Sequence, residues 1–100
     1  MVDWDRIEGF DWDAGNAGKS ERKHGVSRIE AEQVFFNRPL VVADDTRHSD
    51  SEPRLHALGR SDAGRLLHVT FTLRRRGSLL RVISARDMNR KERAVYAADA

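Results

Sequence analysis

The chain has 100 residues, of which 39% are hydrophobic and 34% are charged, and it contains no cysteine. This length and composition predict one domain over residues 1–100 with a single modest core. The absence of cysteine excludes disulfides and cysteine-based zinc sites. The first residues lack the basic and apolar stretches of a secretion signal, and no apolar run approaches the roughly 20 residues that span a bilayer. We therefore expect a soluble, cytoplasmic protein that makes no membrane contact.

The charged residues are unevenly distributed, although the net charge is only +2. Residues 1–50 carry 7 basic and 11 acidic side chains, whereas residues 51–100 carry 11 basic and 5 acidic ones. Nearly all basic residues of the second half are arginines, whose planar and permanently charged guanidinium suits phosphate. This pattern indicates a phosphate-rich partner, and ion pairing with the acidic half is an equal alternative for arginines on strands. For the turn that holds Arg74, Arg75 and Arg76, simple solvation is the favoured interpretation.

The first predicted elements are a short strand and a helix. Residues 10–12 alternate apolar and acidic side chains, as a strand with one buried face does. Asp13 then stands where it can cap a helix that runs through Lys23, and Gly25 is the expected left-handed stop.

Two further helices are predicted from capping pairs. Ser27 and Glu30 have the spacing of a reciprocal capping box, and the helix that they start must end before Pro39. Asn89 and Glu92 repeat this spacing ahead of an alanine-rich run, which predicts a short C-terminal helix.

Four more strands are predicted between these helices. Residues 40–43 form a short apolar run, and a polar loop over residues 44–53 separates it from three longer strand-like runs. Those runs cover residues 54–61, 65–73 and 79–86, and their short glycine-containing connections predict an antiparallel meander. The expected fold is therefore α+β: an antiparallel sheet of four to five strands with two N-terminal helices and a C-terminal helix.

Strand alternation predicts which side chains face the core. The contacts between sheet and helices are assigned to Phe35, Val69, Phe71 and Val82. By the same alternation Arg60 shares a face with Arg54, His56 and Leu58, and Arg86 shares a face with Leu80, Val82 and Ser84. Because helices are expected to cover only one face of such a sheet, the other face, with its arginine and histidine, is predicted to be free for a ligand.

Two other groupings are given structural interpretations. The acidic residues and His48 of the 44–53 loop match no metal-ligand spacing, so neither a metal site nor a cofactor is predicted. Phe10 and Trp12 are expected to be core residues rather than a platform on which bases stack.

A series of short motifs, taken in order and spacing, resembles the BrnT family of toxins over nearly the whole chain from Phe10 onward. The motifs are Phe10–Asp13, Arg22–Ser27, Val34–Phe35, Asp45–Ser49, Leu58–Ser61, Val82–Arg86, and Arg90–Arg93 followed by Tyr96. Three segments depart from the family pattern. Residues 1–8 form an extra or flexible leader, Arg74–Ser78 is a longer and more basic turn than usual, and Asp87–Asn89 replaces a threonine-capped segment.

The resemblance implies a fold similar to that of RelE-type ribonucleases and an endoribonuclease that cleaves RNA without a metal or cofactor. It also implies a type II toxin–antitoxin system in which a BrnA-like ribbon-helix-helix antitoxin neutralises the toxin. Because such antitoxins are dimers, two toxins are expected to flank one antitoxin dimer. DNA is expected to be contacted only through the antitoxin.

Metal-free RNA cleavage uses the ribose 2′-hydroxyl as the nucleophile. It needs one group to withdraw the 2′ proton, one to protonate the departing 5′ oxygen, and fixed positive charge for the transition state. With the resemblance, His24 becomes the leading acid/base candidate, because histidine titrates near neutrality, and Lys23 stands beside it. From the residue types alone, a helix-terminal cap is the favoured role of His24.

Arginines are the candidates for the positive charge. Arg60 and Arg86 lie at or near strand ends, and with Lys23 and His24 they complete the predicted catalytic set. Their structural alternative is ion pairing with the second helix, through Glu30 or Glu32. Arg81 and Tyr96 are weaker candidates that would bind the substrate, and Tyr96 has packing of the last helix as its alternative.

Two other function classes fit the same residues. A non-catalytic RNA- or protein-binding module would use the same arginines and differ from a ribonuclease at Lys23 and His24. A structural interaction protein would pair its arginines and use the free sheet face as an interface.

Overall fold

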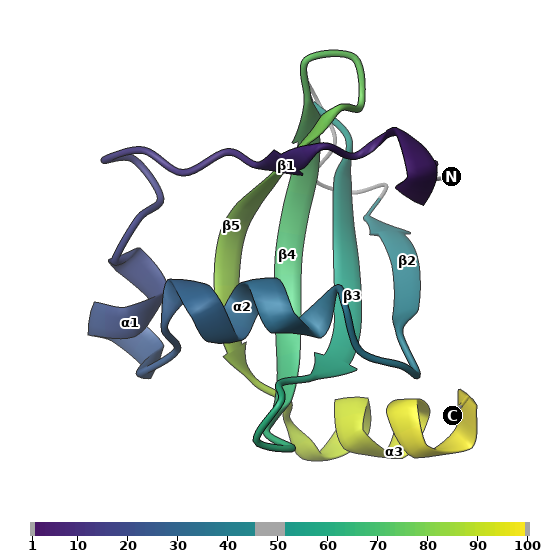
Figure 1. Ribbon diagram of the computed structural model, residues 1–100. Helices are drawn as coiled ribbons and strands as arrows, with labels where there is room; N and C mark the ends of the chain where they lie inside the picture. Colours follow the sequence, from purple (N-terminus) through teal and green to yellow (C-terminus); the bar gives the residue numbers. More distant parts are fainter. Residues whose placement is uncertain (1, 46–51, 100) are drawn as a thin grey trace.

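The computed structural model describes residues 2–45 and 52–99, and its elements follow the predicted order (Figure 1). The elements are η1 (Trp4–Arg6), β1 (Gly9–Phe10), α1 (Lys19–His24), α2 (Arg28–Val34), β2 (Val41–Asp45), β3 (Arg54–Arg60), β4 (Leu66–Arg74), β5 (Leu79–Asp87) and α3 (Arg90–Asp99). The predicted α+β class is confirmed. Most of the predicted 44–53 loop, with His48, lies outside the described residues. No helix in the described ranges is long and apolar enough to cross a membrane.

The five strands form one sheet in the order β1-β5-β4-β3-β2. The pairs β2–β3, β3–β4 and β4–β5 are antiparallel, as predicted, whereas β1 runs parallel to β5. The sheet is therefore mixed rather than wholly antiparallel. The reason is that the chain leaves β1 at one edge, passes through α1 and α2, and enters β2 at the opposite edge (Figure 1).

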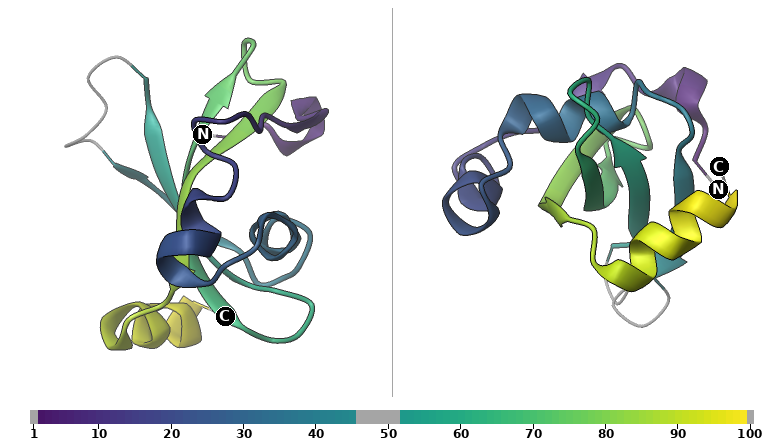
Figure 2. Two further views of the ribbon diagram at one scale, coloured as in Figure 1. Left: turned by 90° about the vertical axis from the view of Figure 1, so that its left-hand side faces the viewer. Right: turned by 90° about the horizontal axis from the view of Figure 1, so that it is seen from below.

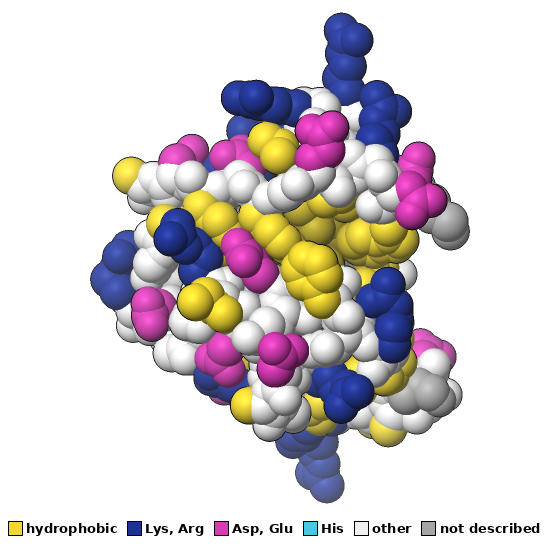
Figure 3. Space-filling view, viewed as in Figure 1, with side chains coloured by type: hydrophobic (Ala, Val, Ile, Leu, Met, Phe, Trp, Pro, Cys, Tyr) yellow, Lys and Arg dark blue, Asp and Glu magenta, His cyan; other side chains and the backbone are white. Residues whose placement is uncertain are grey.

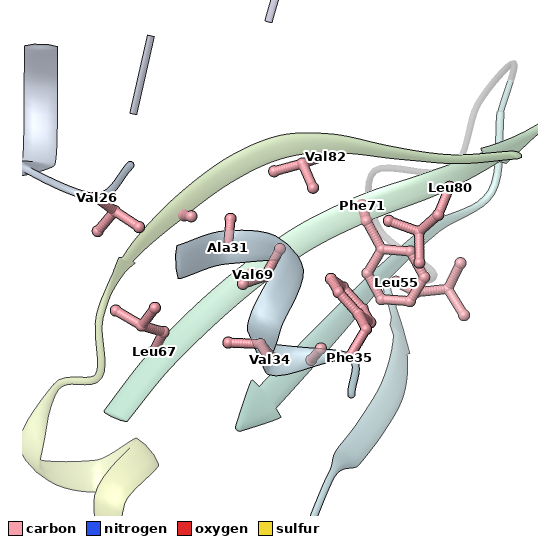
Figure 4. Close-up of a cluster of buried hydrophobic side chains, with 12 residues drawn as sticks. Val26, Ala31, Val34, Phe35, Leu55, Leu67, Val69, Phe71, Leu80 and Val82 are labelled. Carbon is pink, nitrogen blue, oxygen red and sulfur yellow. The ribbon is translucent and has the colours of Figure 1, made fainter. Parts of the chain in front are cut away.

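The main core lies between the sheet and α2, on what we call the near face (Figure 4). The predicted core residues Phe35, Val69, Phe71 and Val82 are all buried there, so that assignment is confirmed. Gly59 allows the close approach of α2, since a Cβ at this position would lie 2.7 Å from Val34 Cγ1. The neighbouring Arg60 consequently points to the opposite side, which we call the far face.

One irregularity reverses a predicted orientation. Opposite Thr70 and Phe71, β5 carries one extra residue, Ile83, so strict alternation fails at that point. Val82 and Leu80 remain in the near-face core, whereas Arg86 lies on the far face, where its carboxylate partner also lies. The prediction that Arg86 shares a face with Leu80 and Val82 was therefore wrong. Arg60 and Arg86 instead share the far face.

The last helix covers one end of the far face (Figure 2). Its Tyr96 and the preceding Met88 are buried against Leu58, with Val41 and Leu66 packed around them. Leu58 and Val41 alternate with residues of the main core, so this second cluster lies on the other side of the sheet. The expectation that helices cover only one face was wrong, because α3 also has an apolar side to bury.

The segment between β1 and α1 follows the outer edge of β5. The Asp11 amide donates to Leu80 O at 2.9 Å, and Asn16 Nδ2 donates to Val82 O at 2.8 Å. Asp13 does not cap α1, which begins only at Lys19. Its carboxylate instead accepts hydrogen bonds from the Gly15 amide and from Arg81, so the first part of the predicted helix, residues 14–18, is a turn and only Lys19–His24 is helical.

The N-terminal residues pack on the near-face core. Val2 and Ile7 contact the cluster, and the Trp4 ring lies 6.1 Å from the Phe35 ring and 6.4 Å from the Phe71 ring between centroids. The segment expected to be an extra or flexible leader thus contributes apolar surface to the fold.

Phe71 provides a test of the core. Its side chain is 0% exposed, so Phe71→Ala should lower the free energy of unfolding by roughly 3–5 kcal/mol. Phe36, which is 75% exposed, is a matched control, and Phe36→Ala should cost less than about 1 kcal/mol. Urea unfolding followed by circular dichroism measures both. Equal losses in the two variants would show that the core is assigned to the wrong residues.

Candidate functional site

The four predicted catalytic residues lie around one end of the sheet, where β3 and β5 end and β4 begins. Arg60 is the last residue of β3, Arg86 is the penultimate residue of β5, and Lys23 and His24 end α1. α3 crosses the same end (Figure 1). Across the described part of the chain, no hydrogen bond or ion pair joins these four side chains to one another.

Arg65 organises the near-face corner of this end. Its Nε donates to Asp87 Oδ1 at 2.7 Å, and its Nη1 donates to Glu30 Oε1 at 3.0 Å and to Gly25 O at 2.9 Å. Its Nη2 donates to Asp87 Oδ2 at 3.0 Å and reaches the carbonyl of His24 at 3.4 Å. One guanidinium therefore binds the end of α1, the first turn of α2 and the end of β5.

His24 is held in this corner through its backbone. The left-handed Gly25, with φ of 68°, ends α1, and Ser20 Oγ of the same helix accepts a hydrogen bond from the Ala85 amide at 2.8 Å. These contacts place His24 beside Asp87, whose pKa is lowered by Arg65 and also by the nearby His24. Lys23 is exposed next to it.

Arg60 and Arg86 lie two strands apart on the far face. Adjacent strands are about 4.8 Å apart and the two positions are offset by two residues along β4, so roughly 12 Å separates the two backbones, within reach of two long side chains that bind one phosphodiester segment. Arg60 is exposed, and its Nε donates to Arg38 O at 3.1 Å. Arg86 forms a forked pair with Glu92, at 2.8 Å and 2.9 Å. Its partner is thus neither of the carboxylates predicted for it, Glu30 and Glu32.

A group that was not predicted from the sequence extends from Arg86 along the far face, away from this end of the sheet. We call it the far-face polar cluster: Asp45, His56, His68, Thr70, Arg86 and Glu92. His56 Nε2 lies 2.8 Å from Asp45 Oδ2, and His56 Nδ1 lies 3.0 Å from Thr70 Oγ1. The rings of His56 and His68 are 4.9 Å apart, and His68 Nε2 is 3.8 Å from Glu92 Oε2.

Electrostatics in this cluster favour a neutral His68 and a charged Glu92. Burial, and then the positive charge of Arg86, lower the pKa of His68, while the Glu92 carboxylate acts in the opposite direction. Hydrogen bonds from Arg86 lower the pKa of Glu92 to about 2. Glu92 also caps α3, because its carboxylate accepts from the Asn89 amide at 2.9 Å while Asn89 Oδ1 accepts from the Glu92 amide at 2.8 Å. The predicted capping box is confirmed.

The two weaker candidates have structural partners. Arg81 binds Asp13 through both Nη atoms, at 3.1 Å and 3.0 Å, and lies 3.5 Å from Asp11. Tyr96 is buried, and its hydroxyl donates to Pro39 O at 2.7 Å. In this arrangement both side chains hold segments together at some distance from His24.

Comparison with protein families gives one match. A family model described as "Ribonuclease toxin, BrnT, of type II toxin-antitoxin system" matches residues 12–92, which include α1, α2 and all strands except β1. The chain belongs to the BrnT family. A search of curated proteins found no match. As a member of the BrnT family, the chain is a ribonuclease toxin of a type II toxin–antitoxin system, with RNA as its substrate and an antitoxin as its partner.

Two parts of the candidate site are not predicted from the sequence, and for the same reason. The sequence places Arg65 only at a strand start, and it predicts Glu30 as a capping residue or as a partner of Arg60 or Arg86, because the contact between Arg65 and Glu30 spans 35 positions. The two histidines meet because β3 and β4 pair, and His56 is directly opposite Thr70. The alternating pattern did place His56 on one strand face with Arg54 and Arg60, which was the one available signal.

Glu92 provides a test of how α3 is attached. Because its pKa falls from 4.5 to about 2 on folding, its stabilising contribution is present above pH 4.5 and is lost as the pH falls toward 2. Glu92→Gln keeps a capping acceptor but should lower the free energy of unfolding above pH 4.5 by up to about 3 kcal/mol, and should weaken the acid dependence. Urea unfolding across this range measures both effects.

Exposed Glu21 on α1 supplies the control, and Glu21→Gln should follow the acid dependence of the unmodified protein. If Glu92→Gln did the same, the pair with Arg86 would not contribute to stability.

Proposed function

We propose that the chain is a metal-independent endoribonuclease that cleaves cytoplasmic RNA to inhibit translation and growth, with Lys23, His24, Arg60 and Arg86 as its catalytic residues. The observation that supports this most directly is the BrnT family match, which covers all four residues. The second support is their common position around one end of the sheet.

In the proposed reaction the ribose 2′-oxygen attacks the adjacent phosphorus. A bond forms between the 2′-oxygen and phosphorus, the bond from phosphorus to the 5′-oxygen breaks, and the products are a cyclic phosphate and a free 5′-hydroxyl. One group takes the 2′ proton and another protonates the leaving 5′-oxygen. His24 has one of these two roles, and Lys23, Arg60 and Arg86 stabilise the added negative charge of the transition state.

The contacts of the two arginines are compatible with this role. Arg60 uses its Nε toward Arg38 and leaves its Nη groups exposed to a phosphate. Arg86 uses both Nη groups toward Glu92, so a phosphate oxygen would meet its Nε edge. Glu92 orients this guanidinium, since a forked pair fixes the plane of both partners.

Cleavage in the presence of a chelator tests the reaction class. Incubating the purified chain with total RNA in excess EDTA should yield fragments that end in a cyclic phosphate, and added Mg²⁺ should not change the rate. Cleavage that stops in EDTA and returns with Mg²⁺ would contradict metal independence. Binding without cleavage in either condition would favour the alternative of a non-catalytic RNA-binding module.

Single substitutions test the residues. His24→Ala should slow cleavage roughly 100-fold or more, because an acid/base group is removed, while the melting temperature stays close to that of the unmodified protein. Arg60→Ala should also slow cleavage, and exposed Arg90 provides a matched control of equal charge. Because Arg86→Ala would leave Glu92 unpaired, Arg86→Lys is the better variant there. Full activity in Arg60→Ala would remove Arg60 from the mechanism, and full activity in Arg86→Lys would show that the reaction needs only the charge at this position and not the forked guanidinium.

We further propose that the partner is a BrnA-like ribbon-helix-helix antitoxin that binds on or beside the far-face arginines. An uninhibited ribonuclease would damage its own cell, and an acidic or amphipathic segment suits the positive field of Arg60 and Arg86. The symmetry of such an antitoxin favours two toxins on one antitoxin dimer, with DNA contacted only through the antitoxin.

Light scattering on the co-expressed complex should give this two-to-two mass. Hydrogen exchange should then show protection at the ends of β3 and β5. The alternative binding site for the antitoxin is on the near face. Two hollows of about 370 and 240 Å³ lie there, and Trp4 and Arg38 line both of them (Figure 3). Protection confined to those hollows would show that the antitoxin inhibits without covering the arginines.

A further inference from the structure

The turn between β4 and β5 has an unusual backbone for its residues. Arg75 has a φ of 51° and Arg76 a φ of 58°, and they are followed by Gly77 at 87°. Hydrogen bonds hold this conformation: the Gly77 amide donates to Arg74 O at 3.1 Å, and Ser78 Oγ donates to Arg75 O at 2.9 Å. In hairpin turns, two consecutive positions with left-handed backbone are usually occupied by asparagine and glycine, because these residues adopt that conformation with the least strain.

The sequence therefore carries arginine where other residues would stabilise the fold better. Strained backbone of this kind can indicate that the side chains serve a purpose other than stability. Both side chains are exposed, and in the part of the chain that the structure describes neither guanidinium has an ion pair or a hydrogen bond. Arg74, the preceding residue, differs because its Nη2 donates to Glu52 at 2.9 Å.

The N-terminal segment adds a third cation. The Glu8 amide donates to Ser78 O at 2.7 Å, and a Cβ on Gly77 would lie 3.8 Å from the side chain of Arg6, which is exposed. Lys and Arg side chains gather over this turn at the top of the molecule (Figure 3). We call Arg6, Arg75 and Arg76 the arginine tip. These contacts also bring two acidic residues, Glu8 and Glu52, close to the arginine tip. The Glu52 carboxylate accepts a hydrogen bond from Arg74.

We propose that the arginine tip is a second RNA-binding site, which holds the phosphates of substrate that extends beyond the scissile bond. This inference rests on the proposed function, since the family's RNA substrate is the polyanion that would reach the tip. β4 spans nine residues between the candidate active site and the tip, or roughly 26–30 Å. The tip would therefore contact only RNA long enough to follow the sheet, and it would add affinity for longer substrates with no requirement for sequence.

Salt-dependent binding of two RNAs tests this proposal. Both carry 2′-O-methyl groups, which remove the nucleophile and prevent cleavage during the measurement. One is too short to span the 32 Å long axis of the protein, and the other exceeds it. Each contact with a single-stranded phosphate contributes about 0.7 to the slope of log affinity against log salt. The double variant Arg75→Ala, Arg76→Ala should therefore have a slope for the long RNA that is smaller by about 1.4. When the salt is lowered from roughly 1 M to 0.1 M, the affinity of this variant should thus rise about 25-fold less than that of the unmodified protein.

Three further variants separate binding from structure. Arg75→Asn, Arg76→Gly supplies the residues that the turn favours, so it should bind the long RNA as weakly as the alanine variant while its melting temperature equals or exceeds that of the unmodified protein. Arg75→Lys, Arg76→Lys retains both charges and should restore the slope. Lys19→Ala, Arg28→Ala removes two exposed cations from α1 and α2, and its slope should match that of the unmodified protein.

The outcomes distinguish this proposal from the proposed function. An unchanged slope in the alanine variant, an equal loss on both RNAs, or an equal loss in the Lys19, Arg28 control would overturn the tip as an RNA site. Loss of antitoxin binding with normal RNA binding would overturn it in favour of a protein contact. Failure of the unmodified chain to cleave RNA, with the tip-dependent slope present, would overturn the ribonuclease mechanism and support the tip.

Discussion

The corner that carries Lys23 and His24 depends on the guanidinium of Arg65. α1 has only six residues, too few to be stable by itself, and its last carbonyls need partners at the helix end. Arg65 donates to two of those carbonyls and is neutralised by Glu30 and Asp87, which belong to other elements. The backbone of Arg65 is itself held, because its amide donates a hydrogen bond to the hydroxyl of Ser61, which is buried in the β3–β4 turn. The position of the candidate acid/base group therefore depends more on one ion-pair network than on its own helix.

The far face is divided between apolar packing and polar contacts, and α3 takes part in both. Tyr96 buries its ring against the sheet, whereas Glu92 starts the helix and binds Arg86. A single carboxylate thus determines where the helix begins and how the arginine is oriented. The two neighbouring histidine rings lie beside this pair, with the neutral form of His68 favoured by burial and by Arg86. Many polar side chains of the far face are therefore held by other residues of the protein, whereas the sequence predicted a face that is free for a ligand.

Local patterns predicted most of the fold, and long-range contacts account for what they missed. The Asn89–Glu92 capping box, the antiparallel meander and the core position of Phe71 follow from neighbouring residues, and the structure confirms them. Of the Ser27–Glu30 pair it confirms the cap by Ser27, whereas the Glu30 carboxylate binds Arg65. The bulge at Ile83 could not be predicted, because one extra residue shows only against a paired strand. Asp13 was assigned to a cap, although its carboxylate is taken by Arg81, 68 positions away. For the candidate site, the position of Arg60 and Arg86 at strand ends could be predicted from the sequence. The partners of Arg65 and Arg86 could not, because they depend on long-range contacts.

The outer edge of β5 is protected by the segment that follows β1. β1 pairs with only two residues of β5, yet Asp11, the Asn16 side chain and the Ser20 hydroxyl bind the backbone groups beyond them. Unsatisfied strand edges are templates on which chains add to one another and aggregate. Covering this edge leaves β2 as the accessible border of the sheet within the described residues, and β2 carries the exposed, charged Asp44. The covered edge thereby keeps copies of the chain from adding to one another through β5.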